Sequence, residues 1–305
     1  MTTRWLSFVP VHPNWHRPSD LILPFHFSPT IRYCAMPAWV HESDPHDLLR
    51  AKLQEKLEDQ DSHCIAVDYS ADALGSPDPD WKGDQPRAIQ ETAYEQLSVL
   101  VFALWLARPT ALSFNMVVHA AAHGDIWVTR QIADADPLLA LPDYSGDAHT
   151  VADFLLAKQL FQILVSLPRD GNLRTAVNAS IRALTERDWT LRFLVLWLVT
   201  ESLFGPEDGR EITYRLSQRV ALFLEEDRDN ARKLFTAVKE SYSWRSKVVH
   251  GLRLSKLTSE KSHTLLTDLE LLIRRSLMSV ISSEDLRGKF DSKSREEYLD
   301  ALAFR

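Results

Sequence analysis

The sequence predicts an α+β protein in which a mixed α/β domain, residues 1–170, precedes an all-α helical bundle, residues 171–305. Strand-like and helix-like segments follow one another in the first part, whereas every segment after residue 174 has helical periodicity. The charge changes at the same place. Residues 1–173 contain 12 Lys and Arg and 22 Asp and Glu, whereas residues 174–305 contain 23 and 20. This difference indicates two units with different surfaces.

The N-terminal domain opens with short apolar segments that prolines interrupt. RWLSFVPV and LILPFHF have the composition of strands, and their prolines predict edge strands or loops. Residues 111–121 and 125–132 predict a pair of strands joined as a hairpin, and the Pro-, Gly- and Asp-rich stretch 75–86 predicts a loop. Helices are predicted over residues 44–59, with Asp44 as N-cap, 87–107 and 149–166.

The C-terminal domain begins after SLPRDGNLR, residues 166–174. Helix 189–204 is apolar almost all round, which predicts a place at the centre of the bundle. Because a buried carboxylate without a partner is costly, Glu201 on this helix should face a cleft or meet a cation. Helices are predicted over residues 174–186, 189–204, 211–225, 229–250, 258–281 and 291–303.

Composition narrows the classes of function. The net charge of −7 and the mildly basic second half favour a local RNA contact over a broad basic patch. Two cysteines and a beginning without the apolar core of a signal peptide favour a reduced, cytoplasmic protein. The longest apolar runs are shorter than the roughly 20 residues of a membrane span, so no membrane contact is expected. Nine glycines argue against a Rossmann or P-loop domain.

The stretch SYSWRSKVVHG, residues 241–251, places Arg245 five residues before His250. Arg245 falls on the apolar stripe that helix 229–250 forms with Val238, Tyr242 and Val249. A guanidinium at such a position either pairs with Glu201 inside the bundle or lines a seam between subunits. His250 is rotated from Arg245 by about 140° and displaced by about 7.5 Å along the axis.

The same stretch closes a longer segment, residues 212–251, that resembles the HEPN superfamily and specifically its Apea-like branch. The matching features are TESLFG at 200–205, YRLSQRVALFL at 214–224, and the closing RSKVVHG with its Arg, four residues and His. The resemblance covers about residues 186–300. It implies a helical bundle that dimerises along the motif-bearing helices, as in metal-independent ribonucleases of toxin–antitoxin and phage-defence systems. Other members of the superfamily bind nucleotides or only dimerise.

The resemblance also implies roles for individual residues. Arg245 and His250 take the catalytic positions, and Ser246 fills the place of the small polar residue that often follows the motif arginine. Glu201 matches an acidic position of this branch. From the helix itself, Tyr242 is expected to be a supporting core residue. Trp244 and Lys247 are candidate RNA contacts, through base stacking and phosphate binding, or else surface residues. Arg215 and Arg219 could form an ion pair with Glu201 or stabilise the fold.

These residue types suit RNA cleavage by attack of the 2′-hydroxyl on the neighbouring phosphorus. An imidazole can take or give a proton near neutral pH, and a guanidinium offers a fork of donors to the phosphate oxygens. No metal or cofactor is then required, and two subunits would bring two such pairs into one cleft. The expected partners are therefore RNA and a second copy of the chain. The acidic N-terminal domain would act as a sensor or in substrate selection, and would suit a protein inhibitor or antitoxin.

Two other interpretations stay open at this stage. In the first, the bundle is a non-catalytic HEPN dimerisation or nucleotide-binding module, and Arg245 and His250 are structural. In the second, the chain is a metal-dependent hydrolase built around His119 and His123, whose spacing would place them on one face of a helix.

Overall fold

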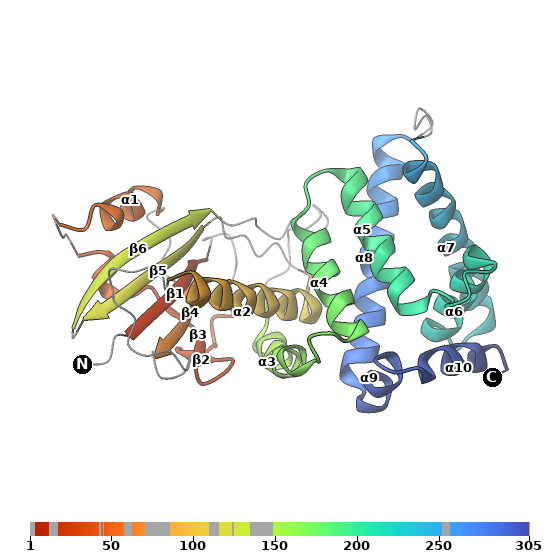
Figure 1. Ribbon diagram of the computed structural model, residues 1–305, viewed down its shortest axis with the longest axis horizontal. Coiled ribbons are helices and arrows are strands. Elements are labelled where there is room, and N and C mark those ends of the chain that lie inside the picture. Colours follow the sequence, from red (N-terminus) through yellow and green to blue (C-terminus); the bar gives the residue numbers. More distant parts are fainter. Residues whose placement is uncertain are drawn as a thin grey trace. The chain divides into compact units, whose positions relative to one another are not determined.

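The chain divides into two compact units, Met1–Val165 and Ser166–Arg305. The first unit contains an antiparallel sheet and the second is helical (Figure 1). The predicted α+β class is confirmed, while the HEPN-like arrangement of the helices stays a prediction. The computed structural model describes residues 4–11, 18–42, 44, 46–57, 63–70, 86–109, 116–123, 125–134, 149–251 and 257–304.

Within the described part of the chain, the sheet has six strands in the order β2-β3-β4-β1-β5-β6, and each neighbouring pair is antiparallel. The predicted pair of strands in residues 111–132 is confirmed as β5 and β6, which pair from Met116↔Asp134 to His123↔Ile126. The strands are β1 (Arg4–Pro10), β2 (Phe25–His26), β3 (Ile31–Ala35), β4 (His63–Ser70), β5 (Met116–His123) and β6 (Ile126–Asp134).

The prediction of an edge strand at RWLSFVPV is wrong, because β1 lies between β4 and β5 in the middle of the sheet. Pro10 is tolerated there since it is the last residue of the strand, beyond the part that pairs with β5. Strand β4 was not predicted, although four of its residues in a row, Cys64–Val67, are buried. Such a short apolar run has no periodicity that separates strand from helix.

Among the described residues, the α-helices α1 (Leu48–Lys56), α2 (Pro86–Ala107) and α3 (Val151–Ser166) accompany the sheet, together with the 3-10 turn η1 (Ala38–Val40). Asp47, rather than the predicted Asp44, is the N-cap of α1 and accepts a bond from the Arg50 amide. Leu53 of α1 packs into an apolar cluster with Phe8 and Cys64 on one face of the sheet. Phe154 of α3 contacts Tyr33, whose side chain points to the opposite face. Residues 75–85 of the predicted loop lie outside the described residues.

The helices of the second unit begin and end within three residues of the predicted ones, except at the C-terminus. There the predicted helix 291–303 is partly wrong, because Asp291 ends one short helix and a second begins at Ser294. The helices are α4 (Asn172–Thr185), α5 (Trp189–Phe204), α6 (Ile212–Leu224), α7 (Arg228–Val249), α8 (Ser259–Ser282), α9 (Glu284–Phe290), α10 (Ser294–Ala301) and the 3-10 turn η4 (Leu302–Phe304).

Helix α5 contacts α4, α6, α7 and α8, as its apolar sequence predicts. Its inner face is fully buried and carries Phe193, Trp197 and Phe204. Its outer face is not buried, because the side chains of Leu191 and Leu198 are 52% and 55% exposed. The helix is therefore central in its contacts but leaves an apolar stripe on the surface. Within the described residues, none of the helices has both the length and the apolar character needed to cross a bilayer.

Candidate functional site

Arg245 of α7 and Glu201 of α5 form an ion pair at the surface of the bundle. The Arg245 Nη2 lies 3.1 Å from Oε1 and 3.2 Å from Oε2 of Glu201. The two side chains are 30% and 23% exposed, so both are partly open to solvent, although Oε1 of Glu201 is itself buried. Among the contacts of the described residues, Arg245 donates one hydrogen bond to Glu201, from Nη2 to Oε2. The remaining guanidinium donors are then available to a ligand.

Tyr242 supports this pair from the core side. Its ring lies one turn before Arg245 on α7, with the guanidinium carbon 5.5 Å from the ring centroid. The buried ring meets Trp197 edge-on, with centroids 5.0 Å apart and planes at 88°. Burial, followed by the negative charge of Glu201 and a hydrogen bond with it, raises the pKa of Tyr242 to about 12. Tyr242 thus stays protonated and fixes the inner side of the Arg245–Glu201 pair.

His250 is the C-cap residue of α7, and its side chain is exposed. Its amide donates to the Ser246 carbonyl at 3.2 Å, which completes the last turn. Gly251 follows with φ +60°, a conformation that side-chain-bearing residues adopt at a cost. In the described part of the chain, no hydrogen bond joins the His250 ring to Arg245. A single chain therefore places the two groups at the same helix end without joining them.

The remaining candidates on this helix end lie beside the pair. The Lys247 Nζ is 3.9 Å from the centroid of the Trp244 ring, a cation–π contact between two half-buried side chains. Ser246 is half-buried between Arg245 and Lys247. The predicted apolar stripe is wrong at its end, because Val248 is buried whereas Val249 is 48% exposed. An apolar side chain is therefore exposed to solvent next to His250.

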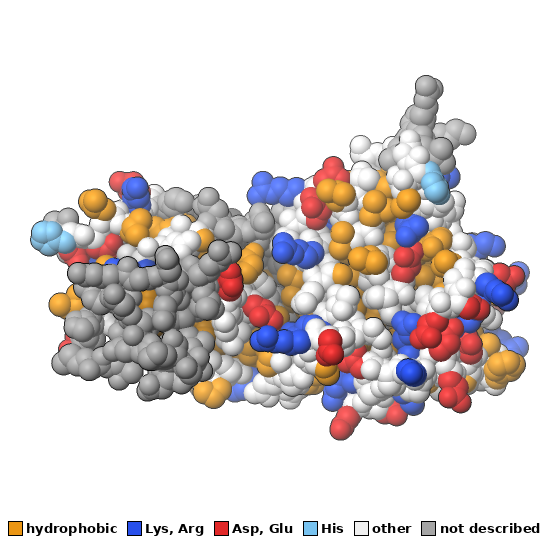
Figure 2. Space-filling view, viewed as in Figure 1, with side chains coloured by type: hydrophobic (Ala, Val, Ile, Leu, Met, Phe, Trp, Pro, Cys, Tyr) orange, Lys and Arg blue, Asp and Glu red, His pale blue; other side chains and the backbone are white. Residues whose placement is uncertain are grey.

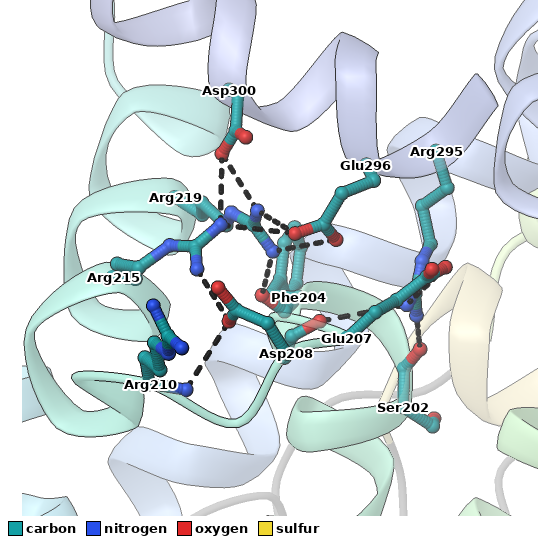
Figure 3. Close-up of polar contacts among 11 residues, drawn as sticks. Ser202, Phe204, Glu207, Asp208, Arg210, Arg215, Arg219, Arg295, Glu296 and Asp300 are labelled. Atoms are coloured by element: carbon teal, nitrogen blue, oxygen red, sulfur yellow. Dashed lines mark hydrogen bonds and ion pairs between the residues drawn. The ribbon is translucent and has the colours of Figure 1, made fainter. Parts of the chain in front are cut away.

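Arg215 and Arg219 do not contact Glu201, contrary to one of the sequence-based alternatives. They lie side by side on α6 and bind Glu296 and Asp300 of α10 (Figure 3). The Arg219 Nη2 is 2.6 Å from one carboxylate oxygen of each acid. Sequence reasoning missed both acids, although 215/219 and 296/300 share the i, i+4 spacing that puts two side chains on one helix face.

This α6–α10 network also holds the end of the helix that carries Glu201. The Phe204 carbonyl accepts from Arg219 at 3.2 Å, and the Ser202 and Gly205 carbonyls accept from Arg295 (Figure 3). These acceptors lie at the C-terminus of α5, where carbonyls have no partner inside the helix. The two arginines therefore fix the last turn of α5, and Glu201 with it.

The metal-site interpretation of His119 and His123 is wrong in its geometry. Both residues lie in strand β5, where positions i and i+4 are about 13 Å apart, too far to share one metal ion. The buried His119 ring contacts the Ser7 hydroxyl, with Nδ1 and Oγ 2.7 Å apart, and burial lowers its pKa to about 4. The His123 side chain lies outside the described residues. Among those residues, no group of three or more His, Cys, Asp or Glu is arranged to hold a metal.

Hydrophobic side chains gather on one face of the C-terminal unit (Figure 2). A groove of about 610 Å³ lies between α7 and α8, with an apolar wall that includes Trp197, Val238 and Leu269. Two ion pairs between lining residues are formed there, Lys261–Glu240 at 2.8 Å and Arg275–Glu225 at 2.7 Å. Trp197 of the groove contacts Tyr242, which in turn contacts Arg245, so two adjacent rings connect the groove to the Arg245–Glu201 pair.

Comparison of the chain with protein-family models, curated proteins and solved structures finds no match. A function must therefore be inferred from the motif of residues 241–251, the segments around it and the geometry described above.

Proposed function

We propose that the chain is a HEPN-type, metal-independent endoribonuclease that acts as a cytoplasmic homodimer. The observation that supports this most is the end of α7. There Arg245 is held by Glu201 yet reachable from solvent, and His250 ends the same helix with an exposed ring. A fixed cation and a titratable imidazole on one rigid element are what phosphodiester cleavage without a metal requires.

Arg245 would stabilise the transition state. When the 2′-hydroxyl attacks the neighbouring phosphorus, the equatorial oxygens gain negative charge, and a guanidinium binds that charge more strongly than the starting diester. Glu201 and Tyr242 position the side chain for this task, because the carboxylate holds Nη2 and the ring lies beneath the guanidinium. Fixing the cation in advance lowers the cost of orienting it during the reaction.

His250 would transfer the protons. A neutral imidazole can remove the proton of the 2′-hydroxyl, and its protonated form can give a proton to the leaving 5′-oxygen. One exposed imidazole can perform one of these roles at a time. Two copies related by a two-fold axis would supply both a base and an acid to one cleft.

An apolar surface beside the pair supports the association of two copies. Leu198 is 55% exposed and lies one turn before Glu201 on α5, and Leu191 lies two turns further on the same face. Val249 adds exposed apolar surface next to His250. Apolar side chains clustered around a functional group are typical of protein interfaces. RNA would then enter a cleft bordered by Trp244 and Lys247.

The biological setting that fits this activity is a toxin or a phage-defence effector. The acidic N-terminal unit would serve as a sensor or in substrate selection, and its charge suits a protein inhibitor or antitoxin with a basic surface.

Cleavage of RNA by the purified full chain in the presence of EDTA tests the proposal. We expect the wild type to cut RNA, and His250→Ala to reduce the rate by about 10²–10⁴-fold, the usual contribution of a general acid or base. Arg245→Ala should reduce it by about 10²–10³-fold, as for loss of a charge-stabilising donor. Arg232→Ala, which removes an exposed arginine from the same helix, is the matched control and should cut at the wild-type rate. If the wild type and both active-site variants all leave the RNA intact, the proposal that the chain is a ribonuclease is rejected.

A non-catalytic HEPN module is the second candidate, and the Arg245–Glu201 ion pair is the observation that favours it. In that case the ion pair has a structural role and joins α7 to α5. The groove of about 610 Å³ between α7 and α8 would then bind the base of a nucleotide. Binding of ATP by the wild type, with RNA left intact and with binding lost in a groove variant such as Leu269→Lys, would favour this candidate.

A further inference from the structure

The two cysteines of the chain face each other across strands β3 and β4. Cys34 and Cys64 are direct partners in the antiparallel register, and their Sγ atoms are 3.8 Å apart. Directly opposed residues in such a pair have Cα atoms about 4.5 or about 5.5 Å apart. A disulfide requires a Cα separation of about 4.4–6.8 Å. The backbone therefore already has the spacing of a disulfide, and a side-chain rotation is enough to bring the sulfur atoms together.

The two thiols differ in access. Cys64 is fully buried in the cluster that contains Phe8 and Leu53, whereas Cys34 is partly exposed. Strand β2 pairs only with Arg32 and Tyr33, so among the described residues the sheet ends at β3 beside Cys34. Cys34 is therefore the more exposed of the two thiols, and Cys64 is enclosed by its apolar neighbours.

The two thiols also differ in chemistry. A hydrogen bond with Cys64, and then the positive charge of Arg32, lower the pKa of Cys34 to about 7 against the opposing effect of burial. The hydrogen bond with Cys34 and burial raise the pKa of Cys64. Cys34 thus has the character of a reactive thiolate, and Cys64 that of a protonated thiol held next to it.

We propose that Cys34 and Cys64 form a modification site at which hydrogen peroxide oxidises the thiol pair to a disulfide within one chain. The Cys34 thiolate attacks one oxygen of the peroxide, the O–O bond breaks, and hydroxide leaves and takes up a proton to become water. The resulting sulfenic acid is attacked by the Cys64 sulfur. An S–S bond forms, the S–O bond breaks, and the hydroxyl leaves with the Cys64 proton as a second water. The sulfur pair loses two electrons, and the peroxide gains them.

This site is independent of the proposed ribonuclease, because every group that it uses lies in the first unit. The disulfide would connect β3 to β4 within the cluster on which Leu53 of α1 packs. An accessible low-pKa thiol beside a second thiol is the arrangement of redox-sensing cysteines. After exposure to peroxide, the N-terminal unit would thereby carry a disulfide that it lacked before.

The test treats the reduced, folded full chain with hydrogen peroxide, then blocks remaining thiols with N-ethylmaleimide and measures the intact mass. We expect both thiols to be lost together, with the mass of two hydrogen atoms removed, and dithiothreitol to restore both. A peptide map should contain the Cys34–Cys64 cross-link. Retention of both thiols, or stepwise overoxidation of Cys34 with Cys64 still free, would overturn the proposal.

Two variants separate the roles of the thiols. In Cys64→Ala, the Cys34 sulfenic acid should accumulate and be trapped by dimedone, whereas the wild type should show little adduct because the second thiol consumes the acid. In Cys34→Ala, the buried Cys64 should remain unmodified. A disulfide-linked dimer on a non-reducing gel in place of the internal cross-link, or equal dimedone labelling of wild type and Cys64→Ala, would contradict the site. Circular dichroism of both variants verifies that they are folded.

Discussion

Replacement of Arg219 by methionine tests how the end of α5 is held. The Arg219 side chain is 3% exposed, and Nη2 lies 2.6 Å from Glu296 and 2.6 Å from Asp300, while Nη1 binds the Phe204 carbonyl at 3.2 Å. A hydrogen bond to a charged partner contributes about 1.5–3 kcal/mol. The Asp300 contact counts for less because that side chain is half-exposed. We therefore expect Arg219→Met to lower the free energy of unfolding by about 3 kcal/mol.

Arg215→Met is the matched control, one turn away on the same helix and in contact with the same two acids. Its side chain is more exposed, so its removal should cost about 0.5–1 kcal/mol. Urea unfolding of the two variants, followed by circular dichroism, measures both values. Equal losses, or a loss below about 1 kcal/mol for Arg219→Met, would refute the view that the buried guanidinium holds α5.

At acid pH, the difference in the free energy of unfolding between Arg219→Met and the wild type should become smaller. The hydrogen bond from Arg219 lowers the pKa of Asp300, and this stabilisation is present above the unfolded-state pKa and is lost as the pH falls through the folded-state value. Repeating the urea unfolding at about pH 3 measures this; an unchanged difference would contradict it. In the first unit, the pKa of His119 falls from 6.5 to about 4 in the folded state, so only the unfolded chain takes up this proton between those values. The unit should lose about 3 kcal/mol as the pH falls across that range. Hydrogen exchange of β1 and β5 measures this loss, which should be absent in His119→Asn. Glu201→Gln should lower the pKa of Tyr242 from about 12 part of the way towards 10.0, since burial is the largest cause of the shift and remains. Ultraviolet titration against Tyr242→Phe measures it, and an unshifted pKa would show that Glu201 does not act on the ring.

The helices of the second unit were predictable because their determinants are local. Asp188, Asp227 and Thr258 cap α5, α7 and α8 through their own side chains, directly before segments of helical periodicity. The boundary between α9 and α10 was not predictable in this way. Asp291 ends α9 there and also accepts a bond from the Leu173 amide, a contact across 118 residues that no local pattern indicates.

The sheet was less predictable because its order depends on pairs distant in sequence. Strand β1 carries a proline and suggests an edge, yet it lies in the centre because β4 and β5 pair with it from both sides. The facing of Cys34 and Cys64 depends on the same register and cannot be derived from two cysteines 30 residues apart. For the candidate site, the sequence predicted that Arg245 pairs with Glu201 or lines a seam between subunits. The structure contains the pair with Glu201 and leaves His250 exposed.

The central claim is that Arg245 and His250 promote attack by a 2′-hydroxyl. Cleavage in EDTA of an RNA with a single 2′-deoxy sugar, placed at a linkage that the all-ribose RNA shows to be cut, tests it most directly. We predict that cutting stops at the substituted linkage and continues at the others, that the products end in 2′,3′-cyclic phosphates, and that His250→Ala cuts neither RNA at a measurable rate. Undiminished cutting at the deoxy position would show that water or another nucleophile attacks and would contradict the mechanism. The absence of cutting of the all-ribose RNA would contradict the enzyme itself.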